Sequence, residues 1–165
     1  MNVQHSNSVI DQINFEPILA KLCSPERGLH WDKEKAIKAV QEYKRWLLLH
    51  ILYPNETFAP SRDLDHVWHC HILDTRKYLA DCSIMFGKGR FLHHNPYAGW
   101  ESAEAEAKHQ DVFKRTRELF KSCFGVDLTG KKALCCSGYC DPEVDALIAS
   151  EKNGTSIWRP SFPLG

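Results

Sequence analysis

The 165-residue sequence has no long apolar run and no excess of charge of one sign. Lysine plus arginine equals aspartate plus glutamate at 21 each, so the chain lacks an electrostatic footprint for nucleic acid or an anionic membrane. No apolar stretch approaches the roughly 20 residues that a membrane-spanning helix needs. We therefore expect neither a nucleic-acid partner nor a membrane partner.

Signals for export and for common cofactors are also missing. The N-terminal stretch MNVQHSNSVIDQ has neither the basic nor the apolar region of a secretory signal, which favours a cytoplasmic location. In that reducing compartment the seven cysteines are expected to be free thiols or metal ligands. The sequence contains no G-x-S-x-G, no G-x-x-x-x-G-K-[ST] and no G-x-G-x-x-G. A Ser-His-Asp hydrolase and a nucleotide cofactor are therefore disfavoured.

Helical patterning dominates what is present. With 43% hydrophobic and 11% aromatic residues, the chain suits a single helical domain over residues 1–165 with one core. We predict an all-α fold, a compact bundle of about four to six helices with a structured histidine-bearing loop and an irregular C-terminal tail. Helices are expected at residues 9–23 (interrupted at Pro17), 32–52, 61–87, 102–124 and 142–150. His50 lies on the apolar face of the second of these and is predicted to be a hydrogen-bonded core residue.

The segment 63–81, DLDHVWHCHILDTRKYLAD, is the most unusual part of the sequence. Read as one continuous helix, it places Trp68 in a buried seam, with His69 and His71 at opposite edges of that seam. Asp65 and His69 are four residues apart, so their side chains stand on one face and can share a ligand. His69 and His71 point in nearly opposite directions and cannot hold one ion from a regular helix.

A second histidine pair follows in the segment 91–97, FLHHNPY, which is predicted to be a loop that folds back over the helix. His93 or His94 is the expected third ligand beside Asp65 and His69. Mixed nitrogen and oxygen ligands are preferred by zinc and ferrous iron, so a divalent metal ion is the expected cofactor. Two alternatives stay open: a structural polar network, and a metal-free catalytic or ligand site.

The pattern Asp65-x-x-Trp68-His69-x-His71-x-Leu73, followed by Tyr78 and by an aromatic-apolar pair before His94, resembles the glycine-rich domain-containing protein-like family. The resemblance covers mainly residues 60–97, and the chain is similar to short, stand-alone bacterial-type members. It implies a helical module whose site positions are Asp65, Trp68, His69, His71 and His94, with Trp68 expected to pack. The full set of candidate metal ligands is Asp65, His69, His71, His93 and His94.

The residues therefore support a metal-binding helical protein, with a small zinc or non-haem iron enzyme as the most specific hypothesis. Such an enzyme, hydrolytic or oxidative, would take a small-molecule or protein substrate at the open coordination positions of a three-ligand site. A non-catalytic interaction module is the alternative. A metal-handling protein is a third, favoured by nine histidines and seven cysteines. Three of these cysteines, Cys135, Cys136 and Cys140, lie in segment 131–165.

Overall fold

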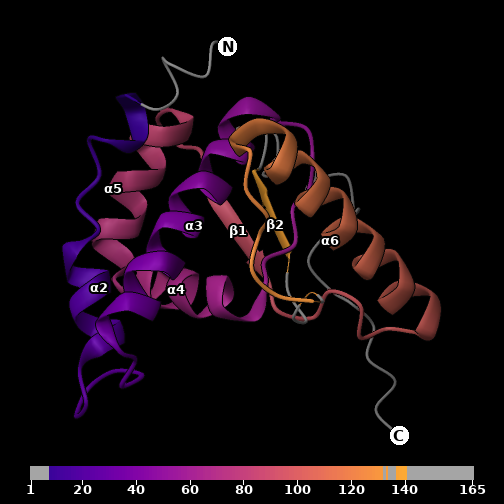
Figure 1. The fold of residues 1–165 in the computed structure, drawn as a ribbon. Helices are drawn as coiled ribbons and strands as arrows, with labels where there is room; N and C mark the ends of the chain where they lie inside the picture. The colour runs from indigo at the N-terminus through magenta and orange to yellow at the C-terminus, as the bar shows by residue number, and fades with distance from the viewer. Residues whose placement is uncertain (1–7, 132, 134–136, 141–165) are drawn as a thin grey trace, which may run out of the picture.

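The computed structural model describes residues 8–131, 133 and 137–140, the last four by their backbone alone. The predicted helical fold is confirmed, although a small sheet accompanies the helices. Figure 1 shows the β1–β2 ribbon between α6 and the group formed by α2 to α5. The elements are α2 (Glu16–Cys23), α3 (Lys33–Leu52), α4 (Arg62–Leu73), α5 (Thr75–Phe86), β1 (Leu92–Asn95), α6 (Ala103–Phe124) and β2 (Ser137–Cys140).

Helix α3 is the centre of the core and contacts α2, α4 and α6. It begins as the sequence predicts, because the Asp32 carboxylate accepts a hydrogen bond from the Lys35 backbone N–H at 2.8 Å. The fully buried Trp46 of α3 meets Trp68 of α4 with 4.8 Å between ring centroids. Large aromatic contacts of this kind bury much apolar surface, and they fix α4 against α3.

The predicted helix over residues 61–87 is wrong in one respect, because it breaks at Asp74 into α4 and α5. Asp74 leaves the helical region (φ −85°, ψ 73°), and its carboxylate caps α5 by accepting from the Lys77 N–H at 3.3 Å. The break rotates every later side chain relative to a continuous helix. A continuous helix would place Leu79 in the buried seam with Trp68 and Asp81 on the opposite face, towards water. In the structure Leu79 is 56% exposed and Asp81 is 5% exposed.

Strands β1 and β2 form an antiparallel two-stranded sheet that the sequence did not predict. Leu92 pairs with Cys140, and His94 pairs with Gly138. The segment that carries His93 and His94 is therefore a strand rather than a loop. Successive side chains of a strand point to opposite faces, so His94 shares its face with the buried Leu92, and His93 lies on the other.

Helix α6 follows its predicted limits. The Ser102 hydroxyl accepts from the Ala105 N–H at 3.1 Å at its start, and Gly125 ends it in the left-handed conformation (φ 69°). Among the residues described, no helix combines the length and the apolar character required to cross a bilayer. The predicted helix at 142–150, the tail, Cys135 and Cys136 lie outside the described residues.

Candidate metal centre

Two side chains of the candidate site come from one turn of α4. Asp65 and His69 are four residues apart and lie on the same face, as the sequence predicts. The Asp65 side chain is fully buried, whereas that of His69 is 47% exposed. The carboxylate therefore forms the floor of the site, and the imidazole of His69 stands at its solvent edge.

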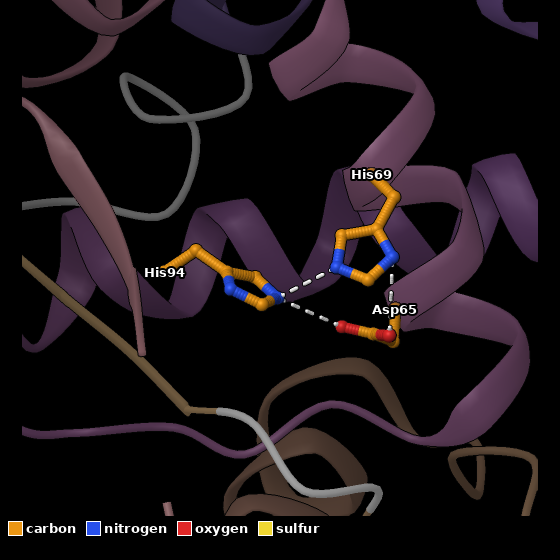
Figure 2. A group of neighbouring side chains, drawn as sticks. All are labelled: Asp65, His69 and His94. Atoms are coloured by element: carbon orange, nitrogen blue, oxygen red, sulfur yellow. Dashed lines mark hydrogen bonds and ion pairs between the residues drawn. The ribbon is translucent and has the colours of Figure 1, made fainter. Parts of the chain in front are cut away.

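His94 of β1 completes the group, as Figure 2 shows. Its Nε2 lies 2.9 Å from Nε2 of His69 and 3.2 Å from Oδ1 of Asp65. The imidazole rests against the Trp68 ring, with 4.5 Å between centroids, and its side chain is only 12% exposed. Trp68 packs, as expected, and in doing so supports one candidate ligand.

The contacts among the three groups are compatible with one arrangement of protons. Nδ1 of His69 lies 3.5 Å from Oδ2 of Asp65, an ion-pair contact that is satisfied when His69 carries its proton on Nδ1. The Nε2 lone pair of His69 then faces Nε2–H of His94, which also points at Oδ1 of Asp65. In this arrangement the proton on Nε2 of His94 lies among three atoms that can each donate an electron pair: that nitrogen, Nε2 of His69 and Oδ1 of Asp65. A metal ion that displaces this proton would take the same position.

Burial keeps His69 in the neutral form that binds metals. Removal of its ring from water lowers the pKa of His69 below the usual 6.5. The nearby Asp65 carboxylate raises it, while His94 and His66 lower it, and the net direction is down. Near neutral pH one ring nitrogen of His69 therefore carries a lone pair that can bind a metal ion.

The distances suit a shared ion. Two ligand atoms that each lie about 2.0–2.1 Å from zinc, with a ligand–zinc–ligand angle of about 90° to 110°, are about 2.8 to 3.4 Å from each other. The two distances to His94, 2.9 Å from His69 and 3.2 Å from Asp65, fall in this range. Asp65, His69 and His94 can all offer ligand atoms within 4.8 Å of one another.

His71, a site position implied by the resemblance, lies apart from this group in a buried network of its own. Its Nε2 donates to Oδ2 of Asp81 at 2.9 Å, and its Nδ1 accepts from the Tyr43 hydroxyl at 3.0 Å. Lys77 also reaches Oδ2 of Asp81, at 2.6 Å. Burial lowers the pKa of His71, so the ring is neutral. Sequence reasoning missed Asp81 as its partner because the break at Asp74 was not foreseen.

His93 is also outside the cluster. Its ring contacts Phe91, with 5.1 Å between centroids, on the strand face away from His94. Because neighbouring residues of a strand point to opposite faces, only one of His93 and His94 can face Asp65 and His69. A strand predicted at residues 92–95, with Leu92 facing the core, would have selected His94. Of the five candidate ligands, the structure therefore brings together Asp65, His69 and His94.

Comparison with known proteins places this helical chain in a family. Residues 5–128 match the UCP032817-like family, well over half of the sequence. The chain belongs to the UCP032817-like family. It is also 28% identical over 85 residues to glycine-rich domain-containing protein 1 of Arabidopsis thaliana, covering 47% of this chain and 10% of that protein. The chain thus spans about a tenth of that relative's length, and no solved structure matches it significantly.

The matched region of this UCP032817-like protein contains the whole candidate centre. Asp65, His69 and His94 all lie within residues 5–128. So do helices α4 and α5 and strand β1, which carry and support them. The partner strand β2 and the cysteines of segment 131–165 lie beyond the match.

Proposed function

We propose that this UCP032817-like protein binds one divalent ion, zinc or ferrous iron, through Asp65, His69 and His94. The observation that carries the proposal is the convergence of two imidazole nitrogens and one buried carboxylate oxygen at separations of 2.9 and 3.2 Å. A mixed set of two histidines and one carboxylate is a known ligand set of both zinc and non-haem iron sites. The proposal includes the D-x-x-W-H-x-H core as a site shared with short, stand-alone, bacterial-type relatives.

The buried carboxylate supports the proposal on energetic grounds. A carboxylate removed from water is costly unless opposite charge or several hydrogen bonds compensate it, and Asp65 is fully buried. A divalent ion bound to Asp65, His69 and His94 would bring opposite charge directly to this carboxylate. The exposed edge of His69 provides the entry path that such an ion requires.

A catalytic role is the more specific form of the proposal. Three protein ligands leave at least one coordination position for water or substrate, whereas structural zinc sites are closed by four. On this basis the protein would be a small metal-dependent enzyme that is hydrolytic or oxidative. Replacement of the ion by Co²⁺ tests the open position, since added azide should change the visible spectrum. A spectrum that is insensitive to azide would indicate a closed site.

The metal itself is tested by elemental analysis and thermal unfolding of protein prepared without a His-tag. After repletion with zinc, iron and copper in turn, we expect about one equivalent of zinc or iron per chain. At a hundredfold excess over Kd, a ligand that binds only the native state stabilises it by about 2.7 kcal/mol. That is a rise in Tm of about 5–11 °C for a chain of this size.

Two variants of α4 give the matched comparison. His69→Ala should abolish the rise in Tm, while its own stability changes little because the side chain is exposed. His66→Ala removes a neighbouring histidine that contacts Trp31 at 6.0 Å between centroids and is not a member of the cluster. This control should keep the full response. Substoichiometric metal in the wild-type protein after repletion would defeat the proposal.

A non-catalytic module is the second candidate, and one observation favours it. His94 of β1 already hydrogen-bonds both His69 and Asp65 of α4, so the group can hold β1 against α4 without an ion. In that case added metal leaves Tm unchanged in every variant. A metal-handling protein would instead bind several soft ions per chain, through cysteines as well as histidines.

A further inference from the structure

One hydroxyl group links the three elements from which the candidate centre is built. Tyr78 of α5 is buried, and its hydroxyl accepts from Nε1–H of Trp68 on α4 at 2.9 Å. The same hydroxyl donates to the backbone carbonyl of Leu92, the first residue of β1, at 2.5 Å. Two buried hydrogen bonds through one oxygen therefore set how far β1 lies from α4.

The distance between β1 and α4 also determines how far His94 lies from Asp65 and His69. His94 lies two residues after Leu92 and on the same face of β1, so the position of the Leu92 carbonyl directs the His94 ring. Trp68 lies between Asp65 and His69 on α4, and its ring is the surface against which His94 rests. Figure 2 shows His94 reaching across from β1 to the two α4 side chains.

A thiol of α5 lies at the same place and is a weaker partner. Cys82 lies near the Leu92 backbone and the Tyr78 hydroxyl, and burial raises the pKa of this thiol to about 11. A neutral thiol is a weak donor and a weak acceptor. The Tyr78 hydroxyl is therefore the stronger link between β1 and the helices.

We propose that Tyr78 is a positioning residue of the metal centre, because its hydroxyl links Trp68 to Leu92 and so holds His94 at ligand distance from Asp65 and His69. This inference rests on the proposed function. Groups that orient metal ligands without touching the metal typically change metal affinity about 10- to 100-fold when they are removed. Loss of this hydroxyl leaves all three ligands present and frees the spacing between them.

The test is a zinc titration of the full-length chain and of Tyr78→Phe, with a chelating indicator as competitor. We expect the variant to bind about one zinc ion with an affinity about 10- to 100-fold weaker. With Co²⁺ in place of zinc, its visible absorption bands should shift, since those bands report ligand geometry. If the Tyr78 hydroxyl only stabilised the fold, Tyr78→Phe would be less stable but would keep the wild-type zinc affinity and Co²⁺ spectrum.

Tyr43→Phe is the matched control. Tyr43 is equally buried, and its hydroxyl bonds to Nδ1 of His71, away from the centre. The control should lose a buried hydroxyl and some stability, yet keep the wild-type zinc affinity and Co²⁺ spectrum. Equal zinc affinity in Tyr78→Phe, Tyr43→Phe and the wild type would overturn the inference.

A second variant breaks the same link at its other bond. Trp68→Phe removes the Nε1–H donor to Tyr78 but keeps an aromatic ring beneath His94, and it should also weaken zinc binding. If Tyr78→Phe does not fold, wild-type affinity in Trp68→Phe overturns the inference. Failure of the wild-type chain to bind zinc at all would instead refute the proposed function, so the two failures are distinguishable.

Discussion

Acidification should destabilise this protein through His50, a histidine buried in the α3 core. Its ring is 1% exposed and lies edge-on to Trp46 and Phe58, with centroids 4.4 and 4.9 Å away. Its Nε2 has no hydrogen-bond partner among the residues described. The prediction of a core histidine is therefore confirmed, but this nitrogen lacks the expected hydrogen bond. Burial lowers the pKa of His50 from 6.5 to about 3.

The direction and size of the effect follow from that pKa difference. Between pH 6.5 and pH 3 the unfolded chain binds a proton at this residue that the folded chain does not, so stability falls as the pH falls. Each pH unit in this window costs about 1.4 kcal/mol. From pH 7 to pH 5 the loss is about 2 kcal/mol, a large share of the roughly 5–15 kcal/mol that stabilises a typical domain.

Urea unfolding of metal-free protein at pH 7 and pH 5 measures this loss, and His50→Leu isolates it from the titration of other groups. Leucine is close to histidine in volume and has no polar atom to leave unpaired. Relative to the wild type, the free energy of unfolding of His50→Leu should rise by about 2 kcal/mol between pH 7 and pH 5. An equal difference at both pH values would refute the reasoning.

Three further changes test local features of the fold. Asp81→Asn removes the carboxylate that binds His71, and should lower the free energy of unfolding in urea by about 1.5–3 kcal/mol without altering zinc stoichiometry. Gly28→Ala would place a Cβ 1.6 Å from the Lys21 carbonyl oxygen, so the turn after α2 must shift, at a cost of about 1–3 kcal/mol measured by thermal unfolding. Asp74→Ala removes the cap of α5 and should cost about 0.5–2 kcal/mol in the same urea assay.

The helices could be predicted from the sequence because their local signals are strong. Asp32 caps α3 and Ser102 caps α6, at the residues where the sequence places the starts of these two helices. The break at Asp74 has no glycine or proline to mark it, so the apolar pattern runs on through the interruption. The change in ψ at Asp74 turns Leu79 towards solvent and Asp81 into the interior. A prediction based on one continuous helix places both residues on the wrong side.

The candidate site was predictable where it depends on helical spacing and not where it depends on distant pairing. Asp65 and His69 follow from the four-residue repeat of one helix. The choice of His94 over His93 depends on the strand conformation of residues 92–95, which is stabilised by pairing with residues 137–140 far along the chain. Such short strands have little periodicity of their own, so this part of the site required the structure.

X-ray absorption at the zinc edge of tag-free, zinc-loaded protein tests the central claim most directly. We expect a nitrogen and oxygen shell at about 2.0–2.1 Å, with outer-shell scattering from two imidazoles. That pattern should be lost in a variant carrying both His69→Ala and His94→Ala. A sulfur shell at about 2.3 Å would mean that cysteines hold the ion, and would contradict a centre built from Asp65, His69 and His94.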